Sequence, residues 1–124
     1  MRMMTPTMNA HDLVKHIAEL HGIPRREAPA RASDALFEVG LGEERFRAVK
    51  TFSTGQRQRV KIAQAIVHDP DLVVLDEPTN GLDPQGIREM RDLLLALNAA
   101  GTTVFLSSHL LAEVEQLCTR VGVL

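Results

Sequence analysis

The segment DLVVLDEPTNGLDPQG (71–86) decides the fold class, because it holds a strand signal and a helix signal a few residues apart. Its apolar run LVVL (72–75) is short and continuous, which is typical of a strand buried in a parallel sheet. Asp83 and Pro84 then form the cap and the first turn of a helix. We expect this helix to end at Gly101 and to bury one apolar face, made of Ile87, Met90, Leu94 and Leu97.

Downstream of this segment, strand and helix signals continue to alternate. The run TTVFLS (102–107) predicts a second strand, and RVGVL (120–124) predicts a third. An amphipathic helix is predicted between them, with the apolar side chains Leu110, Leu111, Val114 and Leu117. This order predicts an α/β fold, in which a βαβαβ portion forms a parallel sheet with right-handed crossovers. We expect the sheet to be part of a larger one.

Upstream, the first fifty residues read as helical. Asn9 can cap a helix that Gly22 ends, with Leu13, Ile17 and Leu20 directed inward. A second helix is predicted over residues 29–39, with Gly40 as its stop and with Ala32, Leu36 and Val39 inward. A third is predicted over about residues 54–68. We therefore divide the chain into a helical subdomain (1–51) and an α/β portion (52–124).

The composition favours one ordinary globular protein. Hydrophobic residues make up 44% of the 124 residues and the net charge is −2, so no overall field attracts nucleic acid or anionic lipid. An aromatic content of 3% offers little surface on which bases could stack. The apolar runs are too short to cross a bilayer, and MRMMTPTM (1–8) lacks the core of a signal peptide. With a lone Cys118, these features indicate a cytoplasmic protein without direct membrane insertion or nucleic-acid binding.

The start of the third predicted helix carries an unusual concentration of positive charge. Ser53 and Gln56 fit a capping box, and Gly55 would let another group approach the backbone closely. Three cations follow near the N-terminus of this helix, where the helix macrodipole is already positive: Arg57, Arg59 and Lys61. This arrangement fits an external anion such as phosphate, whereas the alternative is a solvated basic face.

Two adjacent carboxylates end the first predicted strand. Ligands of open α/β sheets bind at the carboxyl ends of the strands. One of Asp76 and Glu77 could hold Mg²⁺, while the other orients or deprotonates a water molecule. His109 follows the next strand and is therefore expected at the same edge. The alternative for the two acids is that they are merely solvated at a strand end, and the alternative for His109 is a structural role. The other histidines do not have the spacing of a zinc site.

Together these residues resemble the ATP-binding-cassette (ABC) ATPases. FSTGQRQR (52–59) resembles their signature motif, and LVVLDE (72–77) their Walker B strand with the catalytic glutamate. NGLD (80–83) resembles their D-loop, and SSH (107–109) their switch histidine. The resemblance covers about residues 50–124, and the region before it resembles the helical subdomain of the family. Details of the last segment are similar to bacterial exporters of drugs or lipids.

The resemblance implies ATP and Mg²⁺ as cofactors and a second cassette as partner. In the family, the signature helix of one cassette faces the γ-phosphate held by the other. The resemblance therefore implies that Asp76 assists Mg²⁺, Glu77 is the general base and His109 senses the γ-phosphate. It further implies transmembrane permease subunits as partners and a location on the inner face of the cell membrane. The residues that it assigns to the partner's nucleotide or to the dimer interface are Ser53, Thr54, Gly55, Gln56 and Asp83.

The sequence departs from the family pattern in two ways. Phe52 and Thr54 replace the commoner Leu and Gly of the signature, while Ser53 and Gly55 are kept. No G-x-x-x-x-G-K-[ST] occurs, so we expect the C-terminal part of a partial P-loop NTPase fold without its phosphate loop. An ATP-hydrolysing exporter subunit is the leading interpretation. The alternatives are a non-hydrolytic module that completes a partner's site and an ATPase of DNA repair or translation.

Overall fold

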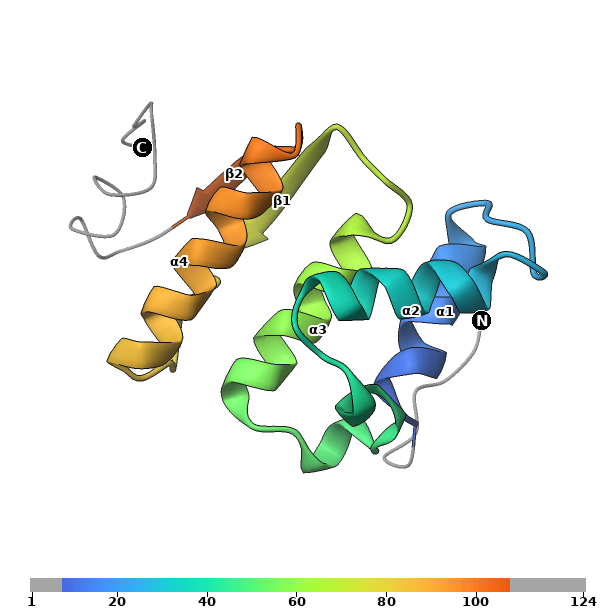
Figure 1. The fold of residues 1–124 in the computed structure, drawn as a ribbon, viewed down its shortest axis with the longest axis horizontal. Helices are drawn as coiled ribbons and strands as arrows, with labels where there is room; N and C mark the ends of the chain where they lie inside the picture. The colour runs from blue at the N-terminus through green and yellow to red at the C-terminus, as the bar shows by residue number, and fades with distance from the viewer. Residues whose placement is uncertain (1–7, 108–124) are drawn as a thin grey trace. The chain divides into compact units, whose positions relative to one another are not determined.

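The computed structural model describes residues 8–107, and these residues form an α/β structure (Figure 1). The chain divides into two compact units, Met1–Pro70 and Asp71–Leu124. The first unit contains α1 (Ala10–Leu20), α2 (Ala28–Glu38), the 3-10 turns η1 (Glu43–Phe46) and η2 (Val49–Thr51), and α3 (Thr54–Ile66). The second contains β1 (Leu72–Asp76), α4 (Pro84–Ala99) and β2 (Thr103–Ser107).

The compact units divide after Pro70, whereas the sequence predicts a helical subdomain that ends at residue 51. The difference concerns α3, which packs against α1 and α2 and so belongs to the first unit by its contacts. Although α3 carries the signature-like residues, it is held in place by packing against α1 and α2. The domain boundary at residue 51 stays a prediction.

Small side chains bring α1 and α2 together. Ala10, Val14 and Ala18 are fully buried along one face of α1 at the i, i+4 spacing. Facing helices can approach closely where such a face is small, and α2 contributes Ala28 and Ala32, also fully buried. The prediction of Leu13 as an inward residue is confirmed, but that of Leu20 is wrong, because Leu20 is 68% exposed at the last position of α1.

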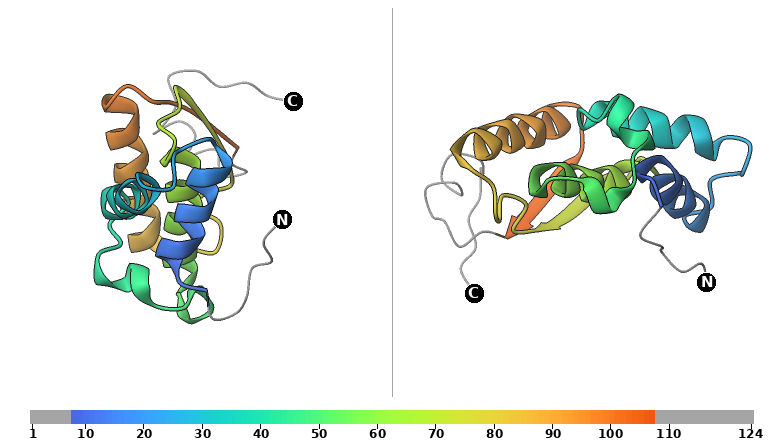
Figure 2. Two further views of the ribbon diagram at one scale, coloured as in Figure 1. Left: turned by 90° about the vertical axis from the view of Figure 1, so that its right-hand side faces the viewer. Right: turned by 90° about the horizontal axis from the view of Figure 1, so that it is seen from below.

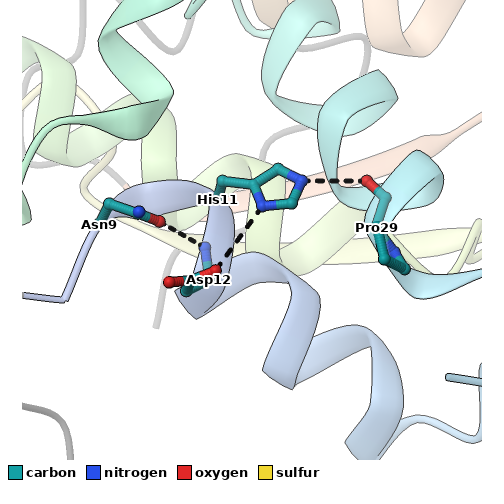
Figure 3. Close-up of polar contacts among 4 residues, drawn as sticks. All are labelled: Asn9, His11, Asp12 and Pro29. Carbon is teal, nitrogen blue, oxygen red and sulfur yellow. Dashed lines mark hydrogen bonds and ion pairs between the residues drawn. The ribbon is translucent and has the colours of Figure 1, made fainter.

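The start of α1 is fixed by a side-chain cap and a contact with α2 (Figure 3). The Asn9 side-chain oxygen accepts a hydrogen bond from the Asp12 N–H at 2.7 Å, which confirms the predicted cap. His11 Nε2 donates to the Pro29 carbonyl oxygen at 3.1 Å and so ties α1 to the first turn of α2. His11 Nδ1 lies 3.8 Å from an Asp12 carboxylate oxygen. These contacts fix the register between the two helix starts.

The second unit is a parallel strand pair with its crossover helix. β1 and β2 pair in parallel from Leu72 with Thr103 to Asp76 with Ser107, which confirms the predicted βαβ order; Figure 2 shows the two strands side by side. α4 connects them and packs against β2. As predicted, Met90, Leu94 and Leu97 are its buried residues, and the chain turns at Gly101 with φ +109°.

The two faces of β1 differ more than its continuous apolar run predicts. Val73 and Leu75 are buried, whereas Leu72 and Val74 are 54% and 68% exposed. The described strand pair thus has one face in the core and one apolar face open, instead of being covered on both sides. The predicted helix after Leu110 and the predicted strand at residues 120–124 lie outside the described residues, as does Cys118.

Candidate functional site

The carboxyl ends of β1 and β2 bring two acids and a serine into direct contact. The Ser107 hydroxyl donates a hydrogen bond to the Asp76 carboxylate at 2.6 Å. The Ser107 hydroxyl oxygen in turn accepts a hydrogen bond from the Glu77 N–H at 3.0 Å. The Ser107 carbonyl oxygen accepts a second hydrogen bond from the same N–H at 3.1 Å. The parallel register creates this cluster, because it places Asp76 opposite Ser107.

The backbone of Glu77 is held in an unfavourable conformation. Its φ is +44°, in the left-handed region that a residue with a Cβ rarely adopts. The Glu77 carbonyl oxygen accepts the Asn80 N–H at 3.0 Å, so the residue is fixed on both sides. Pro78 and Thr79, which follow it, are buried. Such outliers cost about 1–3 kcal/mol and cluster at functional sites, which makes this turn the leading candidate.

The chemistry of this turn suits a hard cation and a polarised water molecule. Asp76 is exposed at the strand end, so an oxygen of its carboxylate is accessible to Mg²⁺, which binds proteins through one or two carboxylates. Residues 8–107 hold no group of three or more His, Cys, Asp or Glu side chains that could form a metal site. His109, predicted at the same edge, lies outside the described residues.

The predicted capping box at the start of α3 is confirmed. The Ser53 hydroxyl accepts the Gln56 N–H at 3.2 Å, and the Gln56 side-chain oxygen accepts the Ser53 N–H at 3.0 Å. Ser53 and Thr54 are exposed, while Gly55 and Gln56 are half-buried. These residues therefore present a capped helix start at the surface of the first unit.

Two of the cations near this helix start bind backbone carbonyls of their own unit. Arg59 donates to the Val39 carbonyl oxygen at 2.7 Å, and Arg57 donates to that of Lys50 at 3.2 Å. Val39 is the C-cap of α2, where free carbonyls favour a cation. Sequence reasoning missed these partners, because both carbonyls are far from the arginines along the chain. A role for the cations toward an external anion stays a prediction.

Asp83 follows the turn at residues 77–80, here called the Glu77 turn, and is the N-cap of α4. Its carboxylate accepts the Gly86 N–H at 2.7 Å, so the predicted cap is confirmed. Ser107 therefore binds both the Asp76 carboxylate and the Glu77 N–H, whereas the Asp83 carboxylate binds the Gly86 N–H. Sequence reasoning missed the role of Ser107; the signal that could have singled it out is its place opposite Asp76 in a parallel strand pair.

No helix within residues 8–107 is long and apolar enough to cross a membrane.

Comparisons with known proteins identify related chains. A family model described as ABC transporter matches residues 2–80. The linearmycin resistance ATP-binding protein LnrL of Bacillus subtilis is 39% identical over 119 residues, which are 96% of this chain and 38% of LnrL. The bacitracin transport ATP-binding protein BcrA of Bacillus licheniformis is 46% identical over 108 residues, which are 86% of this chain and 34% of BcrA.

The solved structure of cbiO1 from Clostridium perfringens, part of the ABC transporter complex cbiONQ, has the same fold. It superimposes with a TM-score of 0.81 at 31% sequence identity, over 90% of this chain and 45% of that protein. The chain therefore spans less than half the length of each of these three relatives.

Proposed function

Since this chain belongs to the ABC transporter family, we propose that it forms the signature-bearing part of an ATP-hydrolysing exporter subunit. The observation that carries this proposal is the turn at Glu77. This acid has a left-handed backbone and directly follows Asp76 at the carboxyl edge of the sheet. The family match and the relatives named as ATP-binding proteins favour this function over a non-hydrolytic module.

Each residue of the turn has a separate role in the proposed hydrolysis of ATP to ADP and phosphate. The Asp76 carboxylate would bind Mg²⁺, which when bound neutralises charge on the phosphates. The Glu77 carboxylate would orient a water molecule and take its proton as the water attacks. We assign to His109 a contact with the γ-phosphate. The fixed backbone of Glu77 supports its role, because a general base must be held within hydrogen-bond reach of its proton.

The residues of the α3 start would act on a second cassette. We assign Ser53, Thr54, Gly55 and Gln56 to the γ-phosphate bound by that partner, since the N-terminus of a helix favours anions. Asp83 would lie at the interface between the two cassettes. In this arrangement ATP joins the cassettes and its hydrolysis separates them.

The remaining partners and the cargo follow from the relatives. We place the subunit on the cytoplasmic side of the cell membrane, bound to transmembrane permease subunits. The names of LnrL and BcrA refer to linearmycin resistance and bacitracin transport. We therefore infer that the exported compound is a drug or a lipid, as the resemblance to bacterial exporters also implies.

The test is Glu77→Gln in a cassette that carries this chain. The amide keeps the size of the side chain but cannot accept the proton, so phosphate release should fall by about 100-fold or more while ATP still binds. Glu38→Gln, at the exposed end of α2, is the matched control and should release phosphate at the normal rate. Normal hydrolysis by the Glu77→Gln cassette would refute the assignment.

A further inference from the structure

Ser107 contacts both acids of the candidate site, although no motif assigns it a task. We propose that Ser107 is a positioning residue, whose hydroxyl orients the Asp76 carboxylate and fixes the Glu77 backbone at the same time. The inference rests on the proposed function for its effect on hydrolysis, but its structural part can be measured without ATP.

The first half of the argument concerns Asp76. Its carboxylate is exposed at a strand end, where a side chain can rotate among several rotamers. The 2.6 Å hydrogen bond from Ser107 has the length of a charge-assisted O–H···O⁻ bond, about twice as strong as one between neutral groups. This bond selects one orientation of the carboxylate. Its second oxygen is then directed consistently toward a cation.

The second half concerns Glu77. Its left-handed backbone persists only where the surroundings hold it, and its N–H is shared between two oxygens of Ser107. The carbonyl oxygen belongs to every residue type, but the hydroxyl depends on the side chain. A substitution that removes only the hydroxyl therefore keeps the backbone bond between the strands and weakens the hold on Glu77.

One hydroxyl thus links the two acids. It donates its only hydrogen to Asp76 and accepts from Glu77, so the two bonds strengthen each other. Ser107 thereby couples the orientation of the Asp76 carboxylate to the position of the Glu77 backbone.

The experiment compares Ser107→Val with Ser107→Thr. Both side chains are β-branched and suit a strand, but only threonine keeps the hydroxyl. In the 124-residue chain, hydrogen exchange at the Glu77 N–H should be about tenfold faster in Ser107→Val and nearly normal in Ser107→Thr.

In a cassette that carries this chain, Ser107→Val should raise the Mg²⁺ concentration for half-maximal hydrolysis by about fivefold, and Ser107→Thr should restore it. Thr103→Val is the matched control, since Thr103 lies on the same exposed face of β2 but pairs with Leu72. It should change neither readout.

The possible failures are distinct. Equal exchange at the Glu77 N–H and equal Mg²⁺ dependence in the valine and threonine variants would overturn the inference while leaving the proposed function intact. If Glu77→Gln hydrolyses ATP normally but the exchange difference is present, the proposed function is wrong and Ser107 still positions the two residues.

Discussion

Gly40 shows how one backbone conformation supports a contact between helices. It follows α2 with φ +84°, and a Cβ at this position would lie 2.8 Å from the Arg59 guanidinium. That guanidinium binds the Val39 carbonyl next to it. Glycine therefore suits the left-handed turn, and an added Cβ would displace the end of the Arg59 side chain.

We expect Gly40→Ala to lower the free energy of unfolding by about 2 kcal/mol, of which the left-handed backbone accounts for about half. Gly22→Ala separates the two causes. Gly22 has φ +90° but nothing within 4 Å of the added Cβ, so its loss should be only about 1 kcal/mol. Urea unfolding followed by far-UV circular dichroism measures both values. Equal losses would mean that the bond from Arg59 to Val39 contributes little.

His68 provides a pH-dependent term in stability. Its ring stacks on that of His21 with centroids 4.0 Å apart, and its Nδ1 is buried with no hydrogen-bond partner among the described residues. Burial lowers the pKa of His68 below its ordinary value of 6.5, and the nearby His21 and Arg31 lower it further. Asp69 acts in the opposite direction. The folded state therefore favours the neutral ring.

The sign of the pH effect follows from this lowered pKa. As pH falls through 6.5, the unfolded chain binds the proton before the folded chain does, so the free energy of unfolding should decrease. The stabilisation is fully present above that pH. His68→Gln should flatten this dependence in urea titrations between about pH 5 and pH 7, whereas His16→Gln, on α1, should leave the slope intact. A slope unchanged in His68→Gln would exclude His68 as its source.

At the scale of elements, the helix starts combine structural and proposed functional tasks. The Ser53 hydroxyl caps α3, and the Asp83 carboxylate caps α4. A polar side chain at a helix start satisfies N–H groups that have no partner inside the helix. The same N–H groups could donate to an approaching phosphate, so capping and anion binding compete for these N–H groups.

For Asp83 the two tasks can be separated. Asp83→Ala should lower the free energy of unfolding by about 1 kcal/mol, whereas Asp83→Asn should retain the cap and change it by less than about 0.5 kcal/mol. Asp92→Ala, on the exposed side of α4, controls for the loss of a carboxylate on that helix. If Asp83→Asn keeps stability but weakens ATP-driven pairing of cassettes, the charge serves the interface. Thermal melting and size-exclusion chromatography give the two readouts.

At the scale of the whole chain, the two units carry different parts of the proposed function. Asp76, Glu77 and Ser107 belong to the second unit, while Ser53 to Gln56 belong to the first. Asp76 and Glu77 add negative charge where a polyphosphate would bind, and Arg57 and Arg59 already donate to backbone carbonyls. The 124 residues contain no G-x-x-x-x-G-K-[ST] loop that would offset this charge.

We therefore expect the 124-residue chain by itself to bind Mg-ATP only weakly and to release no phosphate. Isothermal titration and a phosphate-release assay on the purified chain test this, with a cassette that also contains the phosphate loop as the positive control. Micromolar affinity with steady turnover would contradict the prediction and would point to a phosphate site elsewhere in the chain.

The sequence by itself determined the parts of this protein that depend on neighbours within about four residues. Asn9, Ser53 and Asp83 were predicted as helix caps, and each accepts its bond from a backbone N–H three residues on. The tertiary structure decided the contacts between distant residues. Asp76 meets Ser107 across 31 positions, and Arg59 meets Val39 across 20. Such contacts depend on strand register and helix packing, that is, on how whole strands and helices align. Local sequence patterns do not encode this alignment. The exposure of Leu20, against its helical pattern, has the same cause.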